Sequence, residues 1–289
     1  MQRVLGVIGG SGIYDIAELT GFSERAVDTP FGAPSDSIYQ GHLGETTLLF
    51  LARHGKGHRI PPHSINYRAN ICALKKLGAE QIISLSAVGS MKEHIQPGHV
   101  VIVDQYIDLT KRRVSTFFDG DLAAHVAMAD PVCPLLARAA ARAAEHAGAT
   151  VVHGGCYLCI EGPQFSTRAE SQLYRSWGVS VIGMTAMPEA KLAREAELPY
   201  ATIALATDYD CWHETEAEVS VEAVLTILKS NAELAKRIVV ELSRDLPDPA
   251  RSSASRALSG AVITAAEALS PEARARLDWL LPDSIRKAV

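Results

Sequence analysis

Two segments of the sequence carry residue types that could bind an oxyanion. Residues 8–12 (IGGSG) follow an apolar run and offer glycine amides and a serine hydroxyl, but they match neither the dinucleotide-binding fingerprint nor the P-loop. Arg53 and His54 follow the apolar run 46–51, where a planar guanidinium fork suits phosphate and an imidazole adds a donor. A structural turn or a solvated loop would explain either segment alone. Together they favour a site for a phosphate-like anion.

Acidic, aromatic and hydroxyl side chains follow other apolar runs. Asp208 and Asp210 come directly after a β-branched run, and two carboxylates there favour recognition of a donor-rich ligand, or general acid catalysis, over a solvated acidic loop. Phe165 suits either stacking on a base or burial in the core. Residues 84–90 (SLSAVGS) and 184–189 (MTAMPE) bring small hydroxyl residues and a helix start. Six polar segments that each follow an apolar run are too regular an arrangement for solvent-exposed loops without a function.

The cysteines and histidines form no metal or redox pattern. Five cysteines are an odd number, and the one CxxC, Cys156 to Cys159, lies in a strand-like run where positions i and i+3 face opposite sides. His54 and His58 are four positions apart, but two glycines between them disfavour a helix. The sequence therefore predicts free thiols and no metal site.

Short apolar runs alternate with amphipathic runs of helix length, which is typical of an α/β domain. Strands are predicted at residues 4–8, 46–51, 81–86, 99–103, 150–153, 156–160, 179–184 and 200–206. Helices are predicted at residues 64–77 with Ser64 as N-cap, and at 134–147, 166–177, 188–196 and 221–242. The six polar segments thus stand at strand ends, and α/β sheets bind small ligands at the carboxyl ends of their strands. We expect a small-molecule enzyme with an anion site.

Composition excludes several broad classes of protein. With 47% hydrophobic and 21% charged residues over 289 positions, the chain is neither disordered nor of low complexity. A net charge of −5 does not favour binding to nucleic acid or to an anionic membrane, which both need an excess of basic residues. No apolar run approaches the roughly 20 residues that a bilayer span needs. The first residues lead into a strand without a signal-peptide pattern, which favours the cytoplasm.

The length suits one large domain, residues 1–289, with a C-terminal helical appendage from about residue 250. Residues 245–255 (DLPDPARSSAS) are rich in Pro, Ser and Asp and predict a break in regular structure. Two final helices are predicted beyond it, at residues 256–269 and 271–281.

The order of nine motifs resembles the trimeric purine nucleoside phosphorylase family, and within it the methylthioadenosine phosphorylases. The motifs are IGGSGIYD, DTPFGAPSD, LARHGKGH, NYRANICALKKLGA, SAVGS, IQPGHVVIVDQYIDLT, EGPQFSTRAES, MTAMPEA and ATDYDCW. The resemblance covers about residues 4–242 and continues weakly to residue 282. It implies a large mixed central β-sheet flanked by helices, and a homotrimer. It also implies phosphorolysis of 5′-methylthioadenosine to adenine and 5-methylthioribose 1-phosphate, with phosphate as co-substrate and no metal or organic cofactor.

The resemblance further implies roles for individual residues. The phosphate would be held by Ser11, Arg53, His54, Ser86, Ala87 and Thr185. The nucleoside would contact Met184 along the ribose, Phe165 over the base, and Ser166 with the catalytic pair Asp208 and Asp210 at the polar edge of the base. The 5′ end would meet the methylthio-wrapping residues Val221, Val224 and Leu280, and His125 donated across a subunit interface. His58 aligns with another histidine that lines the nucleoside pocket.

Three other functions stay open on the sequence. A phosphorylase for 6-oxopurine nucleosides (inosine, guanosine or methylthioinosine) is the closest rival, but its members usually carry asparagine where this chain has Asp208, because an amide can donate to a keto purine. A hydrolytic nucleosidase would need no phosphate groove, and a silent nucleoside-binding module would release no product. Dependence on phosphate separates all of these.

Overall fold

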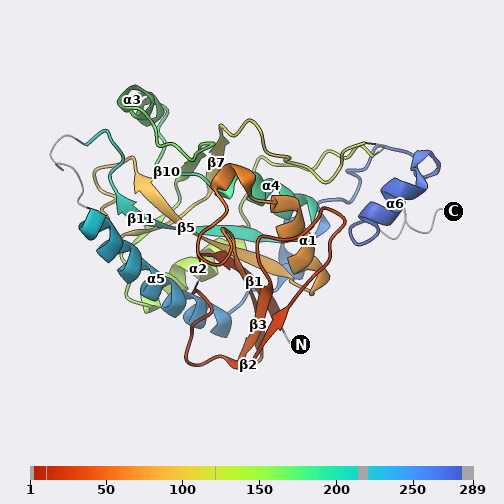
Figure 1. The fold of residues 1–289 in the computed structure, drawn as a ribbon, viewed down its shortest axis with the longest axis horizontal. Helices are drawn as coiled ribbons and strands as arrows, with labels where there is room; N and C mark the ends of the chain where they lie inside the picture. Colours follow the sequence, from red (N-terminus) through yellow and green to blue (C-terminus); the bar gives the residue numbers. More distant parts are fainter. Residues whose placement is uncertain (1–2, 11, 121, 214–220, 282–289) are drawn as a thin grey trace.

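The computed structural model describes residues 3–10, 12–120, 122–213 and 221–281, without the side chains of residues 221–225. Within these residues an 11-stranded mixed sheet forms the centre of the molecule (Figure 1). The strands are β1 (Arg3–Gly9), β2 (Thr20–Arg25), β3 (Ile38–Leu43), β4 (Thr46–Ala52), β5 (Gln81–Ser90), β6 (Val100–Ile102), β7 (Gln105–Asp108), β8 (Val151–His153), β9 (Cys156–Cys159), β10 (Val181–Gly183) and β11 (Tyr200–Asp208). The predicted large mixed sheet is confirmed.

The long strand β5 is the branch point of the sheet. One path runs β2-β3-β4-β1-β5-β10-β9-β7, while β11 pairs with both β5 and β6, and β6 pairs with β8. The pairs β1 with β4, β1 with β5, and β5 with β11 are parallel. These four strands therefore end at the same edge of the sheet, as the sequence predicts for the polar segments that follow them.

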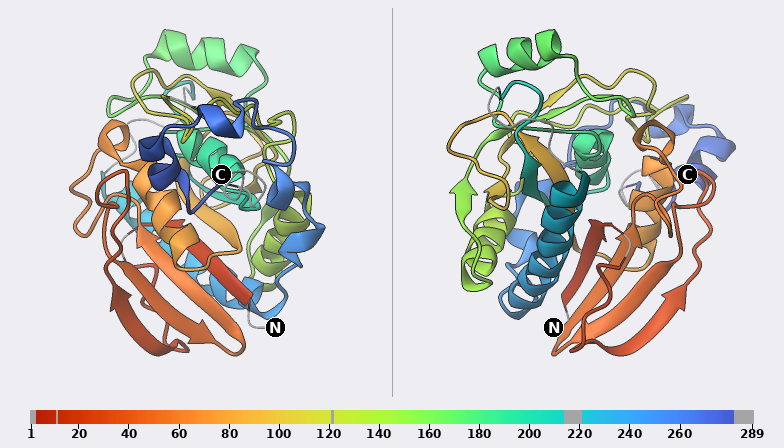
Figure 2. Two further views of the ribbon diagram at one scale, coloured as in Figure 1. Left: turned by 90° about the vertical axis from the view of Figure 1, so that its right-hand side faces the viewer. Right: turned by 60° about the vertical axis from the view of Figure 1, so that its left-hand side comes forward.

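Helices cover both faces of the sheet (Figure 2). On one face, α1 (Tyr67–Lys76) and α4 (Ala186–Glu195) bury Ile71 and Leu192 in the larger core cluster. On the other, α2 (Pro134–His146) packs with α5 (Val221–Arg244), and Leu136 and Ile238 enter a second cluster. A fifth helix, α3 (Arg168–Ser176), buries Tyr174 in a small cluster with Leu158 of β9 and Ile182 of β10. The remaining short elements are η1 (Pro62–Ser64), η2 (Pro249–Arg251), η3 (Ser253–Arg256), η4 (Ala266–Ala268) and α6 (Pro271–Leu277).

Two predicted helix starts move toward the C-terminus. Ser64 is not the N-cap of α1, because residues 62–64 form the turn η1 and the Asn66 side chain accepts a hydrogen bond from the Ala69 amide instead. The helix predicted from residue 166 begins at Arg168, where Thr167 and Glu170 form a reciprocal capping box. The side chain that satisfies the first free amides decides where each helix begins.

The sequence misses three strands and predicts one helix wrongly. β2, β3 and β7 carry exposed or half-buried polar residues without a clear apolar alternation, so no period-2 signal marks them. Residues 256–269 do not form a helix but contain short 3-10 turns. This C-terminal segment still buries Leu258, Leu269 and Leu277 in the same cluster as Ile71.

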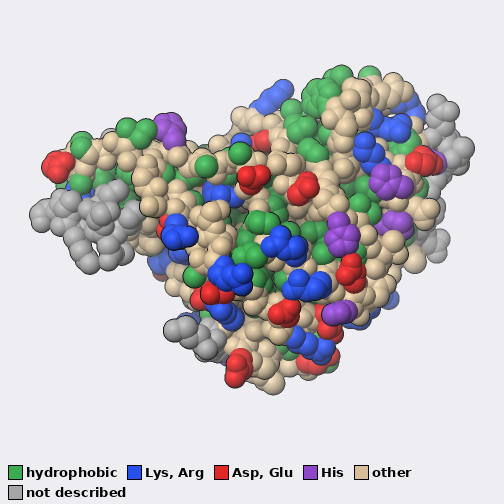
Figure 3. Space-filling view, turned by 180° about the vertical axis from the view of Figure 1, so that it is seen from behind, with side chains coloured by type: hydrophobic (Ala, Val, Ile, Leu, Met, Phe, Trp, Pro, Cys, Tyr) green, Lys and Arg blue, Asp and Glu red, His purple; other side chains and the backbone are tan. Residues whose placement is uncertain are grey.

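The surface seen from behind carries acidic and basic side chains intermingled (Figure 3). No helix among the described residues is long and apolar enough to cross a membrane.

Candidate active site

A pocket of about 490 Å³ opens at the shared carboxyl edge of β1, β4, β5 and β11. This volume lies in the range of small-molecule sites. All six polar segments predicted from the sequence contribute to its wall. The predicted site residues that line it are Arg53, His54, His58, Ser86, Ala87, Phe165, Ser166, Met184, Thr185, Asp208 and Asp210.

Arg53, at the end of β4, is 2% exposed and largely committed to protein acceptors. Its Nε and Nη2 donate to the two carboxylate oxygens of Glu189 at 2.8 and 3.0 Å, Nη2 also donates to Ser84 Oγ at 2.6 Å, and Nη1 donates to the Leu85 carbonyl at 3.1 Å. Four of its five N–H groups are thus occupied, which leaves one, on Nη1, for a ligand. The predicted guanidinium fork therefore faces Glu189, not the anion.

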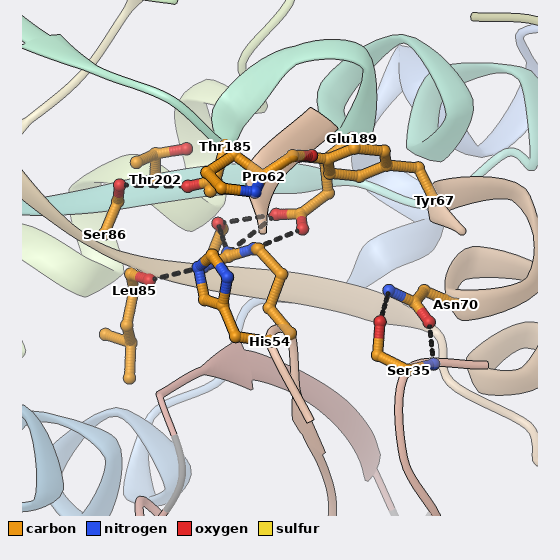
Figure 4. Close-up of polar contacts among 12 residues, drawn as sticks. Ser35, His54, Pro62, Tyr67, Asn70, Leu85, Ser86, Thr185, Glu189 and Thr202 are labelled. Atoms are coloured by element: carbon orange, nitrogen blue, oxygen red, sulfur yellow. Dashed lines mark hydrogen bonds and ion pairs between the residues drawn. The ribbon is translucent and has the colours of Figure 1, made fainter. Parts of the chain in front are cut away.

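The sequence predicts no role for Glu189 beyond its place at a helix start. Its Oε1 also accepts hydrogen bonds from Ser84 Oγ at 2.6 Å and from Tyr200 Oη at 2.8 Å, and the residue is fully buried. In Figure 4, dashed lines mark contacts of this carboxylate. Burial works to lower the pKa of Arg53, but the charge and hydrogen bonds of Glu189 outweigh it and raise that pKa above its usual value.

His54 follows Arg53 and stacks on His58, with 4.0 Å between ring centroids. Its Nδ1 lies 2.8 Å from the Ile60 carbonyl, and since a carbonyl only accepts, Nδ1 carries the proton. Burial lowers the pKa of His54 to about 4, helped by the charge of Arg53 and opposed by the hydrogen bond to Ile60. The neutral ring then has an acceptor at Nε2, which corrects the expectation that this imidazole adds a donor.

Hydroxyl groups form the rest of this end of the pocket. Ser86 Oγ lies 3.0 Å from Tyr157 Oη and 3.4 Å from Thr185 Oγ1. Burial raises the pKa of Tyr157 to about 12, so its hydroxyl keeps its proton. A Cβ on Gly183 would lie 2.0 Å from Tyr157 Oη, so only glycine admits the tyrosine here. Thr185 precedes α4 and makes no capping bond there, which leaves its hydroxyl for other contacts.

The opposite end of the pocket is organised by a bulge in β11. Ala206 pairs with Val88 and Asp208 pairs with Gly89, so two residues of β11 oppose one of β5. A bulge re-aims side chains, and here it places the Asp208 carboxylate so close that a Cβ on Gly89 would lie 3.1 Å from Oδ1. Thr207 Oγ1 donates to Asp208 Oδ2 at 2.6 Å.

Side chains suited to an aromatic ligand lie beside Asp208. Ser171 Oγ donates to Asp210 Oδ2 at 2.5 Å. Ser166 Oγ is buried and has no hydrogen-bond partner among the described residues. Phe165 is 84% exposed on the pocket wall, so the alternative of a core phenylalanine is wrong.

Arg113, a buried arginine for which the sequence predicted no role, hydrogen-bonds to backbone carbonyls of two segments that line the pocket. Arg113 Nη1 donates to the carbonyls of Met184 and Met187, and Nη2 donates to those of Ile160 and Glu161. Its Nε pairs with the Glu161 carboxylate at 2.9 Å. It therefore braces the segments that carry Met184 and Phe165. Leu228 of α5 also lines the pocket and was missed.

Some predicted site residues do not reach this pocket or are not described. His125 is exposed and pairs through its amide with the Ala261 carbonyl, and Leu280 is 6% exposed in the core cluster; neither lines the pocket. Ser11 lies outside the described residues. The side chains of Val221 and Val224 lie outside them as well.

A second cavity of about 470 Å³ lies against α2. Arg138 and Arg194 line it together with Asp104 and Asp130, so its charges balance. None of the six polar segments contributes to it. No group of three His, Cys, Asp or Glu within the described chain is arranged to hold a metal ion.

Comparisons with known proteins agree on one family. The profile of the Phosphorylase superfamily matches residues 4–244. The S-methyl-5′-thioadenosine phosphorylase of Geobacter sulfurreducens is 54% identical over 97% of this chain and 99% of its own length. A crystal structure of methylthioadenosine phosphorylase from an antarctic soil metagenomic library superposes with a TM-score of 0.92, at 48% identity over 98% of this chain and all of its own. A variant of adenosine/methylthioadenosine phosphorylase from Schistosoma mansoni, in complex with methylthioadenosine, has a TM-score of 0.82 at 34% identity over 90% of this chain and 98% of its own.

Proposed function

The chain belongs to the phosphorylase superfamily, and on that premise we propose that it is a pentosyltransferase that cleaves 5′-methylthioadenosine. Phosphate attacks the ribosyl carbon, and the products are adenine and 5-methylthioribose 1-phosphate. One observation carries this proposal: a single pocket holds a buried hydroxyl and guanidinium cluster at one end, and Asp208 with an exposed Phe165 at the other.

This arrangement suits a displacement with a dissociative transition state. Positive charge grows on the ribosyl carbon and negative charge on the departing purine, so an anion is needed on one side and a donor near N7 on the other. Phosphate would lie against Ser86, Ala87, Thr185 and the one remaining N–H of Arg53, and a proton-bearing oxygen of phosphate would donate to His54 Nε2. At the other end, Phe165 would stack on the base, and Ser166, Asp208 and Asp210 would contact its polar edge.

A 6-oxopurine substrate is the less favoured alternative. A carboxyl group at position 208 can accept from the amino group of adenine while sharing a proton with N7. A keto purine presents acceptors at both places, which leaves an ionised carboxylate mispaired.

The first test is incubation of the protein with methylthioadenosine, with and without phosphate, followed by identification of the sugar. The proposal predicts 5-methylthioribose 1-phosphate and no release of adenine without phosphate. Free methylthioribose would identify a hydrolase, and faster turnover of methylthioinosine would identify a 6-oxopurine phosphorylase.

The proposed assembly is a homotrimer with shared sites. His125 lies on a segment that pairs with residues 261–263 and does not line the pocket of its own chain, and Ile263 on the paired segment is an exposed apolar side chain. We propose that His125 completes the pocket of a neighbouring copy. Light scattering should find no active monomer at nanomolar concentration, and mixing impaired His125 and Phe165 variants should restore part of the activity.

Several properties follow from the same proposal. The chain works as one domain from residue 1 to 289, with phosphate as co-substrate, no metal or organic cofactor, and no nucleic-acid or membrane partner. The cytoplasm remains its predicted location. Dialysis against a chelator should leave phosphorolysis unchanged.

A further inference from the structure

Arg53 is held in place before any ligand arrives. Its guanidinium touches Glu189 on both carboxylate oxygens, and Ser84 Oγ joins the two by accepting from Nη2 and donating to Oε1. Side-chain exposures of 3% for Arg53 and 1% for Glu189 show that solvent takes little part in this pair.

A further contact anchors the carboxylate itself. Tyr200 Oη donates to Glu189 Oε1, and Thr202 Oγ1 lies 3.3 Å from Tyr200 Oη and 2.7 Å from Tyr106 Oη. This chain of hydroxyls runs through the buried part of β11, so the position of Glu189 is set by the sheet and not by α4 alone.

We infer that Glu189 is a positioning residue for phosphate: it fixes Arg53 so that one Nη1 hydrogen is presented to the anion. The inference rests on the proposed function. An arginine side chain loses considerable rotamer freedom when it is immobilised, and a site that is already ordered spares the ligand that loss. Glu189 also balances the charge of Arg53, so the arginine acts through geometry more than through net charge.

The test is the split between the KM for phosphate and the KM for methylthioadenosine in Glu189→Gln. An amide has one acceptor oxygen and one NH2 group, so one of the two Arg53 donors that now meet a carboxylate oxygen would face another donor, and the guanidinium must shift from its place. We expect the KM for phosphate to rise at least about tenfold, the scale of one charge-assisted hydrogen bond, with kcat and the KM for the nucleoside within about threefold of wild type. An unchanged or lower KM for phosphate overturns the inference.

Glu195→Gln is the matched control. Glu195 is a buried carboxylate at the end of the same helix, but it accepts from Thr116 Oγ1 and the Phe117 amide and does not touch Arg53. This variant should leave the KM for phosphate unchanged. An equal rise in both variants would mean that any buried carboxylate of α4 has the same effect, and it would overturn the positioning role.

A double variant separates positioning from plain structural support. If Glu189 acts through Arg53, adding Glu189→Gln to Arg53→Ala should change the KM for phosphate less than twofold. A further tenfold rise in that background overturns the inference. Glu189→Asp, which keeps the charge, should restore part of the affinity.

If Glu189→Gln does not fold, Ser84→Ala tests the positioning role of Glu189 instead. It removes one acceptor of Arg53 and one donor to Glu189 without leaving a buried charge unpaired, so we expect a three- to tenfold rise in the KM for phosphate. No rise in this variant overturns the inference. The proposed function fails separately, if the wild-type protein releases adenine without phosphate, releases none, or turns over methylthioinosine faster.

Discussion

At the phosphate end of the pocket, Arg53, Ser86 and Thr185 are no more than 6% exposed, whereas at the base end Phe165 is 84% exposed and Ser166 Oγ has no hydrogen-bond partner within the described part of the chain. Arg53 follows β4, Ser86 lies in β5 and Thr185 precedes α4, and hydrogen bonds within the chain hold these three side chains. Phe165 and Ser166 come from the segment between β9 and α3. The phosphate end is therefore pre-organised, while the base end acquires its contacts from what binds against it.

The difference reflects the ligands proposed for the two ends. An inorganic anion has no apolar surface, so its binding depends on donors that are already in place. A purine offers a large flat face, and it can stack on one aromatic side chain even where that side chain is less firmly held than the donors at the phosphate end. Substitutions at the two ends should accordingly differ in what they damage.

Arg53→Ala should have the largest effect because it damages both fold and function. It leaves the Glu189 carboxylate buried without its cation, so we expect a loss of about 3–5 kcal/mol in the free energy of unfolding. The KM for phosphate should also rise about tenfold to a hundredfold. Urea unfolding and initial rates measure the two effects, and unchanged stability would contradict the buried ion pair.

Asp208→Asn should change base selection and leave the phosphate end alone. The wild-type protein should prefer methylthioadenosine over methylthioinosine by at least about 10²-fold in kcat/KM, the scale of a mispaired buried polar group. The variant should narrow or invert this ratio while the KM for phosphate stays nearly constant. Equal turnover of both nucleosides by the wild type would exclude Asp208 as the selector.

Phe165→Ala tests the base end without touching the core. Stacking of a base on an aromatic ring is worth about 1–3 kcal/mol, so the KM for methylthioadenosine should rise about tenfold. The free energy of unfolding should stay within about 0.5 kcal/mol of wild type, because the ring is exposed. A large loss of stability would mean that the two ends are equally pre-organised.

A pH dependence of stability is expected at the phosphate end. The pKa of His54 is lowered to about 4 in the folded chain, below its ordinary value near 6.5. Between these values the unfolded chain binds more protons, so the stability contributed by a neutral His54 is present above about pH 6.5 and is lost as the pH falls toward 4. Wild type should lose stability over this window more steeply than His54→Asn, and parallel urea profiles would contradict the low pKa.

Local pattern was enough to predict the strands that build the pocket. The apolar runs at β1, β4, β5 and β11 are buried on both faces of the sheet, so hydrophobicity alone marks them. The edge strand β2 was missed because it is mostly exposed, and its pairing with β3 depends on a neighbour and not on its own composition. Helix starts shifted for a similar reason, since Asn66 rather than Ser64 lay within reach of a free amide.

Parallel strands place their carboxyl ends at one edge of the sheet, and the pattern of apolar runs predicts that Arg53, Ser86 and Asp208 meet there. What each of these side chains faces depends on the assembled fold. Arg53 is 136 positions from Glu189, and no local periodicity encodes a hydrogen bond across that separation. The bulge that aims Asp208 likewise arises from pairing between β5 and β11. Strand formation depends on hydrophobic burial, which composition reports, whereas polar pairing depends on exact distances in the assembled sheet, which only folding brings about.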